Sequence, residues 1–186
     1  FDADKGYNLG ILRSSTDSTT WATVESAKYN HDVDYLSQSG ADTKYLAVSV
    51  VQLPGTGEND PVGLLVIAGT GINSANSKTE WVTRRATINS SGLDTDSLGT
   101  SDVFNYATGT VSTPKAIAGH FDQTGTQVVV VGKSIDGSAA DHWIVRRLVS
   151  GVRAWETTDD FAISSGNSSS AASAFFDGTT NKFFVS

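Results

Sequence analysis

An all-β fold is predicted for this chain of 186 residues. Short runs of β-branched and aromatic residues alternate with turns rich in Gly, Asp and Asn, the pattern of an antiparallel strand-and-turn protein. No stretch shows helical periodicity flanked by capping residues. A hairpin-like sequence at residues 127–147 recurs at residues 64–85, so the strands are expected to be organised in repeats.

Strand-like segments in the first half of the chain are separated by loops. The segment at 45–52, YLAVSVVQ, is rich in β-branched residues, which fit a pleated sheet surface. Residues 53–61 carry two of the three prolines together with Gly55 and Gly57, so this segment is expected to be a loop. The strands expected in this half are residues 9–13, 21–25, 45–52, 62–68 and 81–86.

The second half follows the same order of strands and turns. Residues 128–131 are four consecutive valines, as in a buried strand. The dipeptide Asp136-Gly137 favours a turn after it, and the serine-rich residues 164–170 are expected to be a loop. The strands expected in this half are residues 103–106, 116–121, 128–131, 143–147, 159–163, 174–176 and 183–185.

The internal repeat can be followed residue by residue. Residues 81–85, WVTRR, match residues 143–147, WIVRR, and residues 9–13, LGILR, match more loosely. This alignment places Arg13, Arg85 and Arg147 at one repeat position.

Residues 1–186 are therefore interpreted as one domain of three repeats, 9–80, 81–142, and 143–186 completed by 1–8. Four strands per repeat are typical of a β-propeller blade. The third blade takes strands from both chain ends, which pairs edges that would otherwise be exposed. Propellers usually have about four to eight blades, so either oligomerisation completes the ring or the chain is a fragment of a longer array. A β-sandwich whose strands are similar by chance is the alternative.

Two segments carry a resemblance to a known family. Residues 143–161, WIVRRLVSGVRAWETTDDF, and residues 171–186, AASAFFDGTTNKFFVS, resemble the BNR/Asp-box-type propeller repeats of secreted and surface bacterial proteins. The Asp-box turn of that family is degenerate here, because Thr16 stands at its Asp position and only the final Trp155 is kept in the last repeat. The resemblance implies a propeller fold and an extracellular or cell-surface location, and it implies no catalytic role for the Asp-box.

Composition narrows the classes of function. The net charge of −7 makes nucleic acid an unsuitable partner, and no apolar run is long enough for a transmembrane helix. The absence of Cys excludes disulfides, thiol catalysis and thiolate metal sites. The chain begins at Phe1 without an initiator Met, so we expect a mature or trimmed chain, or a fragment.

Arginine and tryptophan are the leading candidates for ligand contacts. Clustered, Arg13, Arg85 and Arg147 could bind carboxylates, as arginines do in sialidases, which use a propeller of related repeats. The competing interpretation is that each arginine packs on or pairs with the adjacent blade. Trp81 and Trp143 would stack on sugar rings if exposed, and would be blade-to-blade packing if buried.

No catalytic constellation or metal motif is found. His31, His120 and His142 have no zinc-binding spacing. Paired aspartates offer oxygen ligands, but none completes a calcium loop, so calcium is an open alternative rather than a requirement. These pairs are Asp2 with Asp4, Asp32 with Asp34, Asp94 with Asp96, and Asp159 with Asp160.

The sequence therefore predicts a secreted or cell-surface binding module that is no enzyme, with a glycan as ligand in the manner of a lectin or adhesin. A homo-oligomer is expected. The first alternative is a structural or adhesive fibre or tip domain without a small-molecule site. The second is a sialidase-like glycoside hydrolase.

Overall fold

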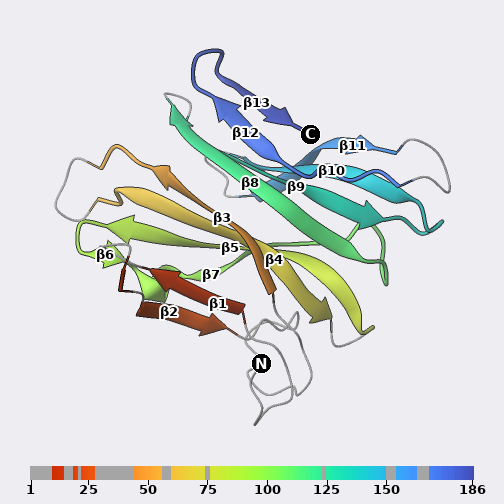
Figure 1. Cartoon of the computed structure of the whole chain (residues 1–186), viewed down its shortest axis with the longest axis horizontal. Helices are drawn as coiled ribbons and strands as arrows, with labels where there is room; N and C mark the ends of the chain where they lie inside the picture. The colour runs from red at the N-terminus through yellow and green to blue at the C-terminus, as the bar shows by residue number, and fades with distance from the viewer. Residues whose placement is uncertain are drawn as a thin grey trace, which may run out of the picture.

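A computed structural model shows the protein to be built of antiparallel β-sheets (Figure 1). In the described part of the chain, the only helical element is the 3-10 turn η1 (Thr95–Ser97), and no helix could cross a membrane. The structure describes residues 10–14, 19–20, 22–27, 44–55, 60–73, 76–122, 125–149, 154–162 and 168–186.

Two large sheets form the centre of the molecule. The first sheet has the order β3-β4-β5-β6, and β7 pairs with β5 as well. The second sheet has the order β11-β10-β9-β8. The strands of the first sheet are β3 (Lys44–Gln52), β4 (Gly63–Asn73), β5 (Lys78–Asn89), β6 (Gly92–Leu93) and β7 (Gly99–Phe104). Those of the second sheet are β8 (Ser112–Asp122), β9 (Gly125–Ile135), β10 (Asp141–Val149) and β11 (Ala154–Phe161).

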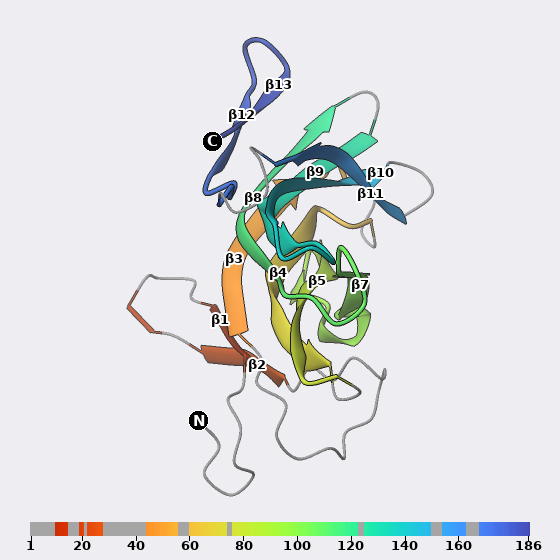
Figure 2. The same ribbon diagram turned by 90° about the vertical axis from the view of Figure 1, so that its right-hand side faces the viewer.

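Two smaller, two-stranded sheets lie at opposite ends of the stack (Figures 1 and 2). One is the hairpin of β1 (Gly10–Ser14) and β2 (Ala22–Ala27), near the edge strand β3. The other is the hairpin of β12 (Ala174–Asp177) and β13 (Lys182–Val185), which lies beside β8. None of the four sheets closes on itself.

The main core lies between the two large sheets. Ala68 and Trp81 of the first sheet pack with Val130 and Ile144 of the second, and each of these side chains is fully buried. A second cluster joins Val51, Val66, Val128 and Leu148 across the same interface. Successive side chains of a strand point to opposite faces of the sheet. One face of β9 therefore meets the first sheet, and its other face carries Val129 and Val131 toward the C-terminal hairpin.

Each of the two large sheets has a close backbone contact between its first two strands in chain order. A Cβ added at Gly69 would lie 2.2 Å from the carbonyl oxygen of Lys44, and one at Gly132 would lie 2.2 Å from that of Thr113. Only glycine fits at this distance. Each glycine also stands beside a register shift, between Tyr45 and Ala47 in the first sheet and between Pro114 and Ala116 in the second.

Another shared feature is a β-bulge before an arginine. The register shifts between Thr83 and Arg84, between Val145 and Arg146, and between Leu12 and Arg13. The bulges therefore place Arg13 at the position of Arg84 and Arg146, one residue from the alignment that the sequence predicted. The sequence match between LGILR and WIVRR is too loose to fix their alignment to the residue.

The all-β fold is confirmed, as are the repeated hairpins, seen as β4–β5 and β9–β10. The strands β4 and β9 run past Gly69 and Gly132 and are longer than the sequence predicted. The propeller and the third blade remain predictions, and the predicted connection at residues 1–8 lies outside the described residues.

Candidate functional site

The best candidate for a ligand site is a cleft of about 510 Å³ at one end of the interface between the two large sheets. Its floor is apolar and includes Leu53, Leu64 and Leu148. Its polar groups are Arg85 and the hydroxyl residues Thr87, Ser97 and Thr126. Pro61, Ala86 and Val149 complete the lining.

Arg85 is the one predicted site residue that lines this cleft. It lies opposite Val66 in the pairing of β5 with β4, and Val66 belongs to the core between the sheets. Arg85 therefore points to the second sheet, whereas its neighbour Arg84 points the other way and donates a hydrogen bond to the Tyr45 hydroxyl at 2.7 Å. An arginine beside an apolar floor is suited to a carboxylate carried on a compact organic ring.

The hydroxyl groups of the cleft are held by a small network. The Thr87 hydroxyl lies 3.0 Å from the Ser97 hydroxyl, and the Ser97 hydroxyl donates to the Asp94 carbonyl at 2.7 Å. Asp94 also caps η1, accepting from the backbone N–H groups of Asp96 and Ser97. Asp94, weighed with Asp96 as a calcium ligand pair, thus uses its carboxylate to cap this turn.

The other predicted arginines lie apart from Arg85. Arg147 forms an ion pair with Glu156 at 2.6 Å on the exposed surface of the second sheet. Arg13 is exposed on β1. The three arginines lie on three different sheets, so the described residues contain no shared carboxylate-binding triad.

Trp81 is part of the core and offers no surface for a sugar. Its side chain is 0% exposed, packs edge-on against Phe104 at 5.9 Å between ring centroids, and donates to the Thr83 hydroxyl at 3.2 Å. The prediction of Trp81 as a ligand contact is therefore wrong, and Trp81 is instead a buried residue between the two large sheets. Trp143 is half-buried at the second-sheet position paired with Phe161, and its indole nitrogen is buried without a hydrogen-bond partner.

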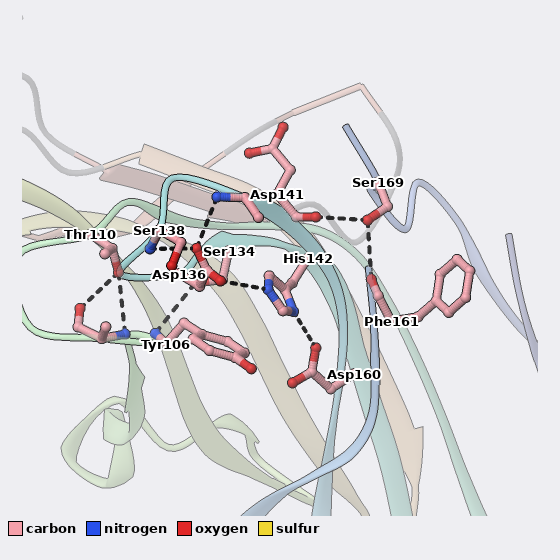
Figure 3. A network of polar contacts seen from close by, with 12 residues as sticks. Tyr106, Thr110, Ser134, Asp136, Ser138, Asp141, His142, Asp160, Phe161 and Ser169 are labelled. Carbon is pink, nitrogen blue, oxygen red and sulfur yellow. Dashed lines mark hydrogen bonds and ion pairs between the residues drawn. The ribbon is translucent and has the colours of Figure 1, made fainter. Parts of the chain in front are cut away.

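A polar network that the sequence did not single out surrounds His142 (Figure 3). Its Nδ1 lies 2.6 Å from a carboxylate oxygen of Asp160, and its Nε2 lies 3.3 Å from one of Asp136. The ring of Tyr106 lies against the imidazole at 4.4 Å between centroids. Asp136 also accepts from the backbone N–H groups of Ser138 and Ala140 and so shapes the β9–β10 turn.

His142 is a structural link rather than a free base, because both ring nitrogens already face carboxylates. Burial disfavours the charged imidazolium, but the hydrogen bonds and charges of Asp160 and Asp136 outweigh it and raise the pKa of His142 above its ordinary value. Hydrogen bonding to Asp160 likewise raises the pKa of Tyr106. The imidazole thus connects the β9–β10 turn to β11.

This link predicts a pH-dependent stability. A raised pKa in the folded state adds stability that is complete below the unfolded value near 6.5 and is lost as pH rises through the folded value. We expect the melting temperature to fall as pH rises above about 6.5, and His142→Gln to remove that part of the fall. Thermal unfolding of both proteins across this range, followed by circular dichroism, measures it. A slope unchanged by His142→Gln would contradict the assignment.

Other candidate ligand groups give no metal site. In the part of the chain that the structure describes, no three His, Asp or Glu side chains gather as metal ligands. Asp160 is engaged by His142, and His120 stacks on the Phe176 ring at 3.9 Å. The pairs Asp2 with Asp4 and Asp32 with Asp34, together with His31, Thr16 and Trp21, lie outside the described residues.

Comparison with family models, with curated proteins and with solved structures finds no match to this chain. The resemblance to BNR/Asp-box-type repeats therefore rests on the sequence motifs alone.

Sequence reasoning missed Arg146, which joins the two large sheets through its ion pair with Asp102. The only available signal was that it adjoins the repeated Arg147. Which of two consecutive arginines faces the core depends on the register of β10 with β9, in which Arg146 lies opposite the core residue Val130, and the sequence does not display that register.

Proposed function

We propose that the protein is an extracellular or cell-surface binding module that binds an acidic glycan in the cleft between its two large sheets. The observation that carries the proposal is the position of Arg85 beside an apolar floor and three hydroxyl residues. A guanidinium recognises a carboxylate with two parallel hydrogen bonds, and the apolar floor suits the carbon face of a sugar ring.

We also propose that the sheets are blades of a β-propeller of BNR/Asp-box type whose ring is completed by oligomerisation. The shared strand order, the matching bulges and the equivalent Gly69 and Gly132 contacts support a repeated unit. Serial stacking of four-stranded sheets is the arrangement expected of neighbouring blades.

A glycan array tests the binding proposal. Sialylated, uronic-acid-containing and neutral glycans are presented with calcium and with a chelator. We expect binding to acidic glycans, and Arg85→Ala should weaken it by about 10-fold or more, because a hydrogen bond to a charged group contributes about 1.5–3 kcal/mol. Arg147→Ala removes an arginine from the equivalent strand position outside the cleft and serves as the matched control. An array without signal, or equal loss in both variants, would contradict the proposal.

A structural or adhesive role is the second candidate. Leu46, Val48 and Val50 are exposed in a row on β3, and Phe175 and Phe184 are exposed on the C-terminal hairpin. Exposed apolar side chains on the edge strand β3 and on the C-terminal hairpin favour assembly with further protein. A silent glycan array together with self-association would favour this role.

A further inference from the structure

One contact between the large sheets is formed by an arginine of β10 that sits in a socket on β7. Arg146 of β10 reaches Asp102 with Nη2–Oδ1 at 2.7 Å and Nε–Oδ2 at 3.0 Å. Its guanidinium carbon lies 4.6 Å from the centroid of the Phe104 ring. An aspartate and a phenylalanine two residues apart thus hold the arginine of the next sheet through an ion pair and a cation–π contact.

The same socket is repeated on β11. Asp159 and Phe161 are again two residues apart and occupy the corresponding positions, opposite Val145 and Trp143 of β10. In the first sheet, Asp102 and Phe104 lie opposite Thr83 and Trp81.

The bulge residues confirm the correspondence of the two sockets. Ser101 precedes Asp102, and its hydroxyl donates to the Thr83 carbonyl at 3.2 Å. Thr158 precedes Asp159, and its hydroxyl donates to the Val145 carbonyl at 3.4 Å. The two strand edges therefore have the same backbone form and present the same two side chains.

The socket on β11 is exposed to solvent. Phe161 is 52% exposed, and Asp159 is exposed as well. Among the described residues no Arg or Lys pairs with Asp159 within 4.0 Å. This surface carries a carboxylate, an exposed phenyl ring and the half-buried Trp143. Such a combination is typical of the centre of a protein–protein interface.

Arg13 is the side chain that matches this socket. It follows the register shift between β1 and β2 as Arg146 follows the one between β10 and β11, and it lies opposite Thr23 as Arg146 lies opposite Thr157. It is exposed. The hairpin β1–β2 lies at the opposite end of the stack from β11 (Figure 1), so Arg13 and the socket of one chain are far apart.

We propose that the outer face of β10–β11 is the docking surface for the β1–β2 hairpin of a second copy, with Arg13 seated between Asp159 and Phe161. Each chain then carries the arginine at one end and the socket at the other. Such a head-to-tail contact forms a closed assembly when the rotation between neighbouring copies brings the last copy back to the first. In a closed dimer, the arginine of each chain sits in the socket of the other, so the dimer has two such contacts. The proposal rests on the proposed completion of the ring by oligomerisation, and it does not depend on whether the cleft binds a glycan.

Charge reversal tests the pairing. Arg13→Glu and Asp159→Arg, each alone, bring like charges together at both contacts of the pair of chains, so we expect the dissociation constant to rise by about 30-fold or more. The doubly substituted chain restores opposite charges and should associate again. An equal mixture of the two single variants should also form a mixed pair, because one contact is native and the other is reversed. Sedimentation equilibrium measures each case.

Lys78→Glu is the matched control, because it reverses an exposed charge at the β4–β5 turn, away from both surfaces. Circular dichroism verifies that every variant is folded. The docking surface is overturned if the unmodified chain does not associate, if the single variants associate as it does, or if neither the double variant nor the mixture recovers. These readouts leave the glycan array untouched, so failure of one proposal is separable from failure of the other.

Discussion

Asp102→Ala is expected to destabilise the protein by about 3–5 kcal/mol, because it leaves Arg146 as a buried charge without its partner. The ion pair lies between the two large sheets, and the side chains of Arg146 and Asp102 are only 11% and 10% exposed. Burial raises the pKa of Asp102, while the guanidinium opposes that rise. Urea unfolding gives the change in the free energy of unfolding.

The loss of stability is expected to come from the broken Asp102–Arg146 ion pair, and a double-mutant cycle tests this. Arg146→Met should be similarly damaging, whereas Asp102→Ala combined with Arg146→Met should cost less than the sum of the two single changes. Glu156→Ala breaks an exposed ion pair, in which the two side chains are 45% and 46% exposed, and should change stability by less than about 1 kcal/mol. Additive single effects would show that Asp102 and Arg146 act independently and would contradict the socket.

Trp81→Ala is expected to cost about 3–5 kcal/mol, because it opens a cavity in the core that joins the two large sheets. The side chain is completely buried and packs against Phe104 at an interplanar angle of 83°. Trp143→Ala should cost less, since Trp143 is only half-buried. Chemical unfolding of both variants measures the difference.

This comparison also separates the two interpretations that the sequence left open for tryptophan. A core residue lowers stability when removed, whereas a sugar-stacking residue lowers ligand affinity and leaves stability nearly unchanged. Loss of glycan binding by folded, fully stable Trp81→Ala protein would contradict the core assignment.

Periodicity and turn chemistry were sufficient to predict the all-β fold. The valines at 128–131 and the alternation at 45–52 mark strands that the structure contains, and the Asp136-Gly137 dipeptide marks the turn between β9 and β10. Strand lengths were underestimated, because hydrogen bonding to a neighbouring strand extends β4 and β9 past glycines that read locally as ends. Local sequence cannot show that a glycine is required by a close carbonyl from another strand.

The candidate site was predictable only in part. Arg85 was identified from the repeat, but its cleft is formed by strands from both large sheets, and such packing has no local signature. Arg146 and Asp102 are 44 residues apart, and the choice between Arg146 and Arg147 as the inward residue depends on the register of β10 with β9. Repetition therefore indicated the positions that matter, while the register decided the face on which each arginine lies.

The molar mass of the unmodified protein in solution tests most directly the central claim that the chain is a series of repeated sheets with complementary ends. Light scattering over a dilution series is expected to give twice the chain mass of 19.5 kDa at the higher concentrations. A mass of 19.5 kDa at every concentration would contradict that claim.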